Sequence, residues 1–201
     1  EGKATALAVK LHAARVKASP ALSKAVVEIL RTVGMADAEF KIAVTPTQPT
    51  ISGADAVDFL FSANASVEPR AIEKIASGGE LSRVMLALKT ILAQHLALPT
   101  IIFDEIDTGV SGRIADAMGD IISALGENMQ VVAITHLPQV ASKGESHFVV
   151  YKQDSRTNIS RLGDDDRVTE IAKMLSGSEI TAAALSQARI LLGVEPKTTL
   201  F

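Results

Sequence analysis

The sequence predicts an α/β fold in which a helical segment and a β-hairpin precede a region of alternating strands and helices. Three observations lead to this prediction. Apolar residues at helical spacing fill the first 35 positions, and runs rich in β-branched and aromatic residues begin at residue 39. After residue 71, strand and helix patterns alternate, which is typical of parallel strands joined by right-handed crossovers in a three-layer α/β core.

The composition bounds the class of protein. The chain has 201 residues, of which 47% are hydrophobic, enough for one substantial core. Its 20 Lys and Arg against 23 Asp and Glu show no basic nucleic-acid footprint over the whole chain. The lack of cysteine excludes disulfides and thiolate metal sites and fits a reducing cytosol. The most apolar region, 84–103, is interrupted by Lys89 and Pro99 and is not expected to span a membrane.

The first 35 residues are predicted to be helical. A helix over 3–18 is expected to be interrupted by Pro20, and a second amphipathic stretch follows, which Gly34 should end. Two interpretations stay open: a pair of ordinary surface helices, or the returning end of a coiled-coil arm. We take 1–35 as the coiled-coil end and 36–201 as the domain that follows it.

Strands and helices are then predicted in order. EFKIAV at 39–44 and AVDFLFSA at 56–63 should form a hairpin, with a loose connection because Pro46, Pro49 and Gly53 lie between them. The later elements are helix 78–97, strand 100–104, helix 112–125, strand 130–134, closing strands 147–151 and 157–161, and helices near 166–175 and 179–192.

The segment Ser77-Gly78-Gly79-Glu80 opens the predicted helix 78–97. Ser and Glu three residues apart form a capping box, in which Ser77 accepts from the Glu80 amide and Glu80 reaches back. The box does not explain two adjacent glycines, which weaken a first helical turn by up to about 1 kcal/mol each. They either shape a turn or let an anion such as phosphate approach the bare helix N-terminus.

Acidic residues follow the buried strand TIIFD. Asp104 and Glu105 lie at its carboxyl end and Asp107 comes shortly after, where ligands of open α/β sheets bind. Adjacent acids of this kind suit a division of labour, one toward Mg²⁺ and the next toward an attacking water. The alternative is a solvated polar loop, with Ser111 capping the next helix.

His136 follows the strand QVVAI and should lie at the same sheet edge as Glu105. A histidine there is either structural, or it hydrogen-bonds a phosphate or a water held by Glu105. His12, His95 and His147 have no such context.

Jointly, the order and spacing of these motifs resemble the C-terminal half of an ABC-type ATPase head, a P-loop NTPase fold. SGGELSR resembles the signature motif, TIIFDE the Walker B strand, IDTGVSG the D-loop region and ITHLPQVA the switch-histidine region. Membrane transporters usually carry Gln in place of Glu80 and Pro in place of Ile106. The motifs are most similar to those of the RecN family of bacterial SMC-like DNA repair proteins, from about residue 4 to 193. One departure is SANASVEPR at 62–70, where such proteins more often have a glycine shortly after the asparagine.

The resemblance implies the following roles. Asp104 should orient Mg²⁺ through water, and Glu105 should polarise the attacking water. His136 should sense the γ-phosphate, and Asp107 should communicate across a dimer of heads. Ser77, Gly78, Gly79 and Glu80 should contact ATP held by the opposite head.

The sequence has no G-x-x-x-x-G-K-[ST] segment, the P-loop that cradles ATP phosphates. SMC-like proteins carry it in an N-terminal lobe, so the implied partners are that lobe of the same protein, a second head and DNA, in the bacterial cytoplasm at the nucleoid. This chain alone is expected to hydrolyse ATP negligibly. The alternatives are a non-catalytic head module that clamps DNA or docks partners, and the ATPase subunit of a transporter.

Overall fold

The computed structural model describes residues 2–96, 98–177 and 179–194. The chain divides into two compact units, Glu1–Ala97 and Leu98–Phe201. The boundary falls inside the region 36–201 that the sequence predicts as one domain.

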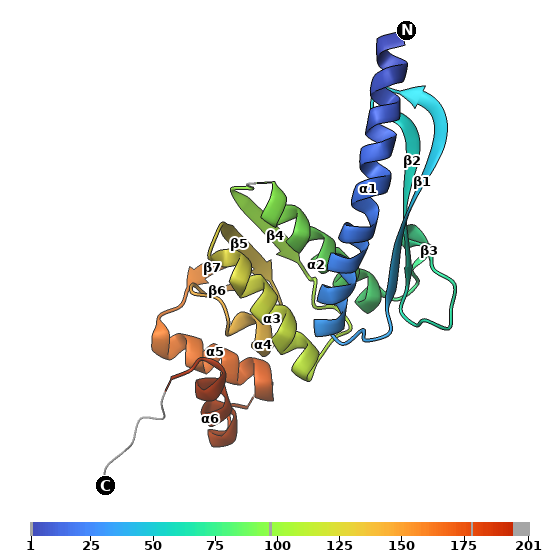
Figure 1. The fold of residues 1–201 in the computed structure, drawn as a ribbon. Helices are drawn as coiled ribbons and strands as arrows, with labels where there is room; N and C mark the ends of the chain where they lie inside the picture. The colour runs from blue at the N-terminus through green and yellow to red at the C-terminus, as the bar shows by residue number, and fades with distance from the viewer. Residues whose placement is uncertain (1, 97, 178, 195–201) are drawn as a thin grey trace. The chain divides into compact units, whose positions relative to one another are not determined.

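The first unit begins with α1 (Gly2–Thr32), a single helix that contains Pro20 (Figure 1). The predicted interruption is therefore wrong. His12, Arg15, Val26 and Leu30 belong to a stripe of less exposed residues that keeps helical spacing on both sides of Pro20, which itself is exposed. An internal proline removes one helix hydrogen bond and clashes with the preceding turn, which together cost roughly 3 kcal/mol. Packing along this stripe offsets that cost.

Gly34 ends α1 as predicted. Its φ is 83°, the left-handed region that glycine adopts without strain. The Met35 amide donates to the Leu30 carbonyl at 3.0 Å and the Gly34 amide donates to the Arg31 carbonyl at 3.3 Å. These two bonds form a Schellman motif, which satisfies the last helix carbonyls and turns the chain toward the first strand.

Strands β1 (Glu39–Thr50) and β2 (Gly53–Ser62) form the predicted antiparallel hairpin, and β3 (Arg70–Ala71) adds a short third strand beside β2. The connection is tighter than predicted, since pairing continues to Thr50 opposite Gly53. Pro46 and Pro49 lie within β1, which is an edge strand, and the register is irregular between Pro46 and Thr50. An edge strand tolerates proline because its outer amides need no ladder partner.

The tip of the hairpin is fastened to α1. Asp55 is 2.7 Å from His12 Nδ1, and Arg15 donates to Asp55 at 3.1 Å and to the Ser52 carbonyl at 2.8 Å. Burial acts to raise the pKa of Asp55, but the hydrogen bonds and charges of His12 and Arg15 outweigh it, so the pKa is lowered. Gly53 has a φ of 118°, and a Cβ there would lie 2.8 Å from the Leu11 side chain. A side chain at this position would have to displace the ends of the Leu11 and Arg15 side chains, and the positive φ would strain it.

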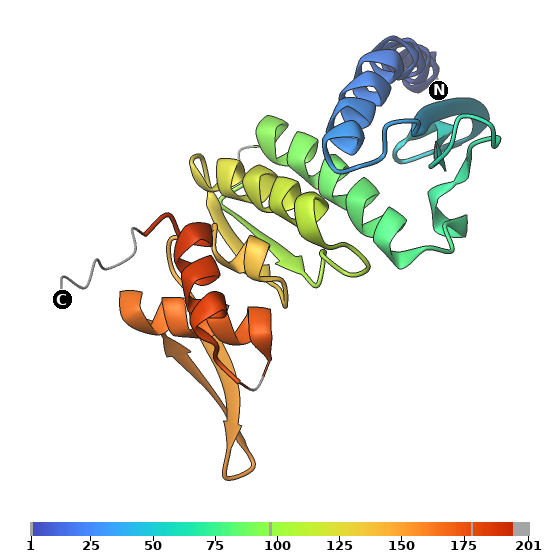
Figure 2. The same cartoon turned by 90° about the horizontal axis from the view of Figure 1, so that it is seen from below.

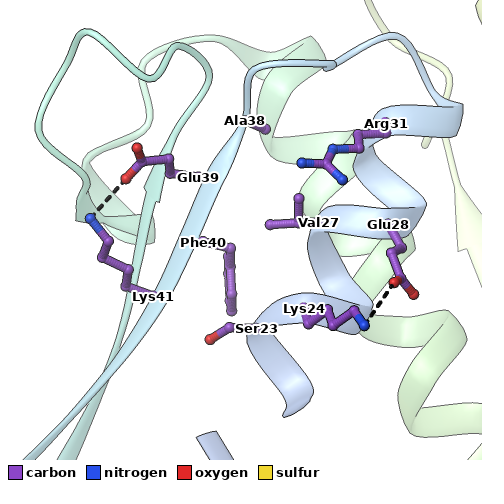
Figure 3. Close-up of a pocket in the computed structure, with 9 residues that line it drawn as sticks. All are labelled: Ser23, Lys24, Val27, Glu28, Arg31, Ala38, Glu39, Phe40 and Lys41. Atoms are coloured by element: carbon purple, nitrogen blue, oxygen red, sulfur yellow. Dashed lines mark ion pairs between the residues drawn. The ribbon is translucent and has the colours of Figure 1, made fainter. Parts of the chain in front are cut away.

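A surface groove of about 430 Å³ lies where the base of α1 meets β1 (Figure 3). Four of its charged residues form two ion pairs, Lys24 with Glu28 at 3.9 Å and Lys41 with Glu39 at 2.7 Å. Such paired, exposed charges are typical of a solvated face. The residues that line it are Ser23, Lys24, Val27, Glu28, Arg31, Ala38, Glu39, Phe40 and Lys41.

After a 3₁₀ turn, η1 (Ile72–Lys74), the first unit ends with α2 (Gly78–His95), which contacts α1. This helix is confirmed, starting where it was predicted and ending two residues earlier. The buried apolar side chains of the unit come from α1, β1, β2 and α2 and include Val26, Leu30, Phe40, Phe61 and Val84.

The second unit contains the predicted alternation. Strands β4 (Thr100–Asp104) and β5 (Gln130–Ile134) pair in parallel, and α3 (Gly112–Gly126) connects them and packs against β5. Ile101 and Phe103 are buried on one face of this sheet. On the other face Ile102, Val132 and Ile134 are 56%, 41% and 52% exposed. Within the described residues the predicted third layer is therefore not complete.

The predicted closing strands also form. β6 (Phe148–Gln153) and β7 (Arg156–Arg161), which follow the short helix α4 (Pro138–Ala141), make an antiparallel hairpin of their own. This hairpin does not close the β4–β5 sheet, because no ladder joins the two sheets in the described part of the chain (Figure 2).

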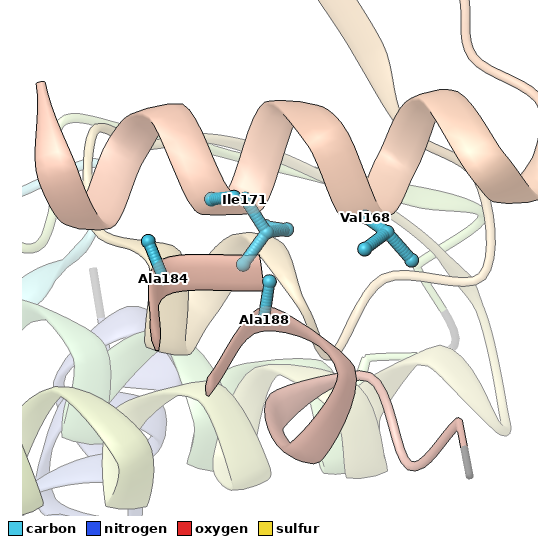
Figure 4. Close-up of a cluster of buried hydrophobic side chains, with 5 residues drawn as sticks. Val168, Ile171, Ala184 and Ala188 are labelled. Carbon is cyan, nitrogen blue, oxygen red and sulfur yellow. The ribbon is translucent and has the colours of Figure 1, made fainter. Parts of the chain in front are cut away.

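Helices α5 (Asp164–Ser176) and α6 (Ala182–Leu191) complete the unit, as predicted. Figure 4 shows Val168 and Ile171 of α5 facing Ala184 and Ala188 of α6, a small cluster of buried side chains. The acidic residues 164–166 form the first turn of α5. Carboxylates stabilise that position because it is the positive end of the helix dipole.

Candidate functional site

The first candidate group lies at the N-terminus of α2. Ser77 is the N-cap, and its hydroxyl accepts from the Glu80 amide at 3.4 Å. Only this half of the capping box forms in the described part of the chain. Ser77 and Gly78 are exposed, and a Cβ at Gly78 would meet nothing within 4 Å. Packing within this chain therefore gives no reason for a glycine at position 78.

The second candidate group lies at the carboxyl ends of β4 and β5. Asp104 ends β4 and is in register with Ile134, the last residue of β5. The Glu105 amide then donates to the Ile134 carbonyl at 3.1 Å, which extends the pairing by one residue. The structure thus brings Asp104, Glu105 and the segment that carries His136 to one sheet edge, as the sequence predicts.

Glu105 has an unusual backbone. Its φ is 46°, in the left-handed region that residues with a Cβ rarely adopt. The amide and the hydroxyl of Thr108 both donate to the Glu105 carbonyl, at 3.3 and 2.8 Å, and these bonds hold the turn. A strained backbone at an exposed acid is typical of functional sites, where the surrounding structure maintains the strain.

Asp107 is fully buried, with an exposed fraction of 0%. Its Oδ2 accepts a hydrogen bond from the Thr135 hydroxyl, and the Thr135 oxygen accepts from the Leu137 amide at 3.0 Å. Asp107 Oδ1 is buried and has no hydrogen-bond partner among the described residues. The loop after β4 is therefore joined to the loop after β5 through one buried carboxylate.

His136 lies next to this link. Its Nδ1 is 3.6 Å from Asp107 Oδ1, while its side chain is 66% exposed. Sequence reasoning did not single out Thr135. The signal was available, because a hydroxyl residue directly after a parallel strand lies at the sheet edge where the acids were expected.

Helices α3 and α4 support the loop that carries His136. Lys143, just after α4, lies 3.0 Å from Asp116 and 2.6 Å from Asp120 of α3. The hydrogen bonds of Asp120 and Asp116 raise the pKa of Lys143 above its ordinary value. Gly119 lies at the same crossing, where a Cβ would be 3.1 Å from the Gln139 carbonyl oxygen. The two helices therefore pack backbone to backbone.

The two candidate groups belong to different units: positions 77–80 lie in the first unit and the acids and His136 in the second. Among the residues that the structure describes, no three His, Asp or Glu side chains cluster as a ready-made metal site. None of the described helices has the length and apolarity needed to cross a membrane.

Comparison with known proteins identifies relatives. No protein-family model matches the chain. It is 45% identical over 191 residues to the DNA repair protein RecN of Rickettsia typhi, and 42% identical over 193 residues to that of Vibrio cholerae. These matches cover 92% and 93% of this chain but 34% and 35% of the relatives. The chain thus spans about a third of the length of the curated relatives it matches.

Solved structures agree on the fold. The Smc head domain with coiled coil and joint of Pyrococcus yayanosii matches with a TM-score of 0.64 at 17% identity, over 78% of this chain and 29% of that one. A chain from work on the ATP-driven dimerisation and DNA-stimulated activation of SMC ATPases matches with a TM-score of 0.59 at 16% identity, over 84% of this chain and 99% of that one. Over nearly its whole length the chain is therefore similar to about a third of the DNA repair protein RecN, and it shares the fold of SMC head domains.

Proposed function

We propose that this chain is the C-terminal lobe of an ATP-hydrolysing head that acts in bacterial DNA double-strand-break repair and recombination. The observation that carries the proposal is the juxtaposition of Asp104 and Glu105 with the His136 segment at one edge of a parallel sheet. In the proposed reaction Glu105 polarises the attacking water and His136 contacts the γ-phosphate. Positioning and electrostatic stabilisation of this kind account for most catalysis of phosphoryl transfer.

The oxygen-rich donor set suits Mg²⁺. Asp104 and Glu105 are exposed carboxylates at the strand end, and hard divalent cations prefer oxygen ligands. Asp104 would hold the ion through water, and the other ligands would come from the nucleotide and from another lobe, since no cluster of three ligands exists in the described residues. When bound, Mg²⁺ neutralises the charge of the phosphates.

The N-terminus of α2 supports a contact with ATP held by a second head. Amides of a first helical turn have no partner within their helix, and they favour anions. The exposed Ser77 and the open space around Gly78 leave this backbone accessible. We assign Ser77, Gly78, Gly79 and Glu80 to that contact. The burial of Asp107 favours a role exerted through its neighbours over direct contact with a nucleotide.

The open face of the β4–β5 sheet supports the N-terminal, P-loop-bearing lobe of the same protein as a partner. A two-stranded sheet is marginal on its own, and the exposed Ile102, Val132 and Ile134 form an apolar surface that a further layer would cover. The missing P-loop is the reason to expect that this chain alone hydrolyses ATP negligibly.

The chemistry is tested by Glu105→Gln in the complete protein. We expect the turnover number for ATP to fall at least about 100-fold, because a positioned acid or base contributes roughly 10²–10⁴. Nucleotide affinity, measured with a fluorescent ATP analogue, should change only a few-fold. Glu127→Gln, at an exposed position after α3, is the matched control and should behave as wild type. Undiminished turnover in Glu105→Gln would overturn the assignment.

The remaining partners follow from the family. We propose that ATP brings two heads together, that the complete protein acts on DNA, and that it works in the cytoplasm at the nucleoid. Sedimentation of the complete protein with and without ATP tests head pairing. ATP turnover with and without duplex DNA tests the link to DNA, and equal rates in both would contradict it.

A further inference from the structure

We propose that Asp107 is a positioning residue. Its carboxylate fastens the loop after β4 to the loop after β5 through Thr135, and it orients the His136 ring with Nδ1 inward and Nε2 outward. The orientation follows from the contacts of this chain, whereas its consequence for turnover rests on the proposed function.

The burial of Asp107 calls for such a role. A carboxylate that loses its hydration is costly unless hydrogen bonds replace the water. Thr135 satisfies Oδ2, whereas Oδ1 is buried without a hydrogen-bond partner among the described residues. His136 Nδ1 lies 3.6 Å from Oδ1, slightly beyond hydrogen-bond distance. Because the histidine side chain is largely exposed and Asp107 is fixed, a small rotation of the ring completes the bond.

The hydrogen bonds of this network run in one direction, from the Leu137 amide to Thr135 and from Thr135 to Asp107. The Leu137 amide donates to the Thr135 oxygen, so the Thr135 hydroxyl proton is left to donate to Asp107. In the proposed arrangement the carboxylate accepts at both oxygens, and the proton of the imidazole then lies on Nδ1, the nitrogen that faces Asp107. The other nitrogen, Nε2, is then the one presented to a ligand. This is the way carboxylates orient metal-binding histidines in other proteins.

The position of Thr135 strengthens the inference. It directly precedes His136 in the chain, so a bond that fixes Thr135 also fixes the backbone that carries the imidazole. It lies 28 residues from Asp107 in sequence, and the contact therefore couples the acidic loop to the histidine loop. A displacement of either loop moves the other.

A double-mutant cycle in the complete protein tests the proposal. Asp107→Asn should lower kcat for ATP about 10- to 100-fold, as loss of an outer partner does in metal sites, with KM changed less than about 3-fold. In a His136→Ala background Asp107→Asn should add less than about 2-fold, because its effect passes through the ring. Asp154→Asn, in the exposed turn of the β6–β7 hairpin, is the matched control. Losses that multiply, or an unchanged kcat, would overturn the proposal.

Two further measurements keep the proposal testable. Thr135→Val should reproduce the loss and Thr135→Ser, which keeps the hydroxyl, should restore most of it; equal losses in both would contradict the link. The second measurement is ¹⁵N NMR of the complete protein labelled at histidine, in which the His136 signal is assigned with His136→Gln. The spectrum should show a proton on Nδ1 of His136 in wild type, and this proton should move to Nε2 in Asp107→Asn. An Nδ1 without a proton overturns the orientation. Wild type without ATP turnover would refute the proposed function, and the NMR result would still decide the orientation.

Discussion

The crossing of α3 and α4 at Gly119 gives the most direct test of the packing that supports the His136 loop. Gly119→Ala adds one methyl group, for which the neighbouring atoms would have to give way by a few tenths of an ångström. The new Cβ would lie 3.0 Å from Lys143 Cγ, 3.1 Å from the Gln139 carbonyl oxygen and 3.4 Å from Val140 Cα. The Lys143 side chain is held by its two ion pairs, and a backbone oxygen has no rotamer by which to withdraw.

The magnitude follows from two opposing effects. Overpacking a well-filled site costs about 1–3 kcal/mol, whereas replacing a helical glycine by alanine returns at most about 1 kcal/mol. We therefore expect the free energy of unfolding of Gly119→Ala to fall by up to about 2 kcal/mol and to lie about 1–3 kcal/mol below that of a glycine-to-alanine change without overpacking. Gly126→Ala in the same helix is the matched control, because its Cβ would meet nothing within 4 Å. The control should be unchanged or stabilised by up to about 1 kcal/mol.

Urea unfolding followed by far-UV circular dichroism measures both variants. Hydrogen exchange of the α3 and α4 segments shows where protection is lost, which matters because two units need not unfold in one step. If Gly119→Ala were as stable as Gly126→Ala, with α4 equally protected, the close approach of the two helices would not exist as described.

Three further predictions follow from the same structure. Gly78→Ala should leave the free energy of unfolding unchanged or slightly raised, yet it should weaken ATP-dependent pairing of heads at least about 10-fold in sedimentation of the complete protein. Because the pKa of Asp55 is lowered, its carboxylate stabilises the fold above pH 3.8, and this stability is lost as the pH falls through the folded-state pKa. The free energy of unfolding of Asp55→Asn, measured against pH, should lack this loss. Burial and the Arg167 charge lower the pKa of His147, so stability should decline as the pH falls below 6.5, and His147→Gln should show a flatter profile in the same urea titrations.

Most of the elements could be predicted from local sequence. The runs TIIFD and QVVAI have strand composition, and they pair in parallel as expected, although one face of the pair is exposed. The helix between them returns the chain to the other end of the sheet, so both strands run in the same direction. Their carboxyl ends therefore lie at the same edge of the sheet. Asp104, Glu105 and His136 could therefore be placed together from strand and helix patterns alone.

Other features depend on tertiary contacts that no local pattern reports. Pro20 breaks an isolated helix, but here α1 is held on both sides of it, by the polar contacts of His12 and Arg15 with Asp55 and by the burial of Val26 and Leu30. The sequence also does not show that Asp107 is buried or that Thr135 is its partner, because burial depends on how two loops 28 residues apart pack. The β6–β7 hairpin fits strand patterns well, but patterns alone do not tell which sheet a strand joins.

The attachment of α1 to the hairpin has a mechanical consequence. The helix is bound at the hairpin tip through Asp55 and again near its base, where Leu30 and Phe40 are buried. Pro20 lies between these two attachments, at the point where a helix would otherwise hinge. The hairpin thus stiffens the helix, because bending at the proline would require the β-hairpin to bend or detach as well.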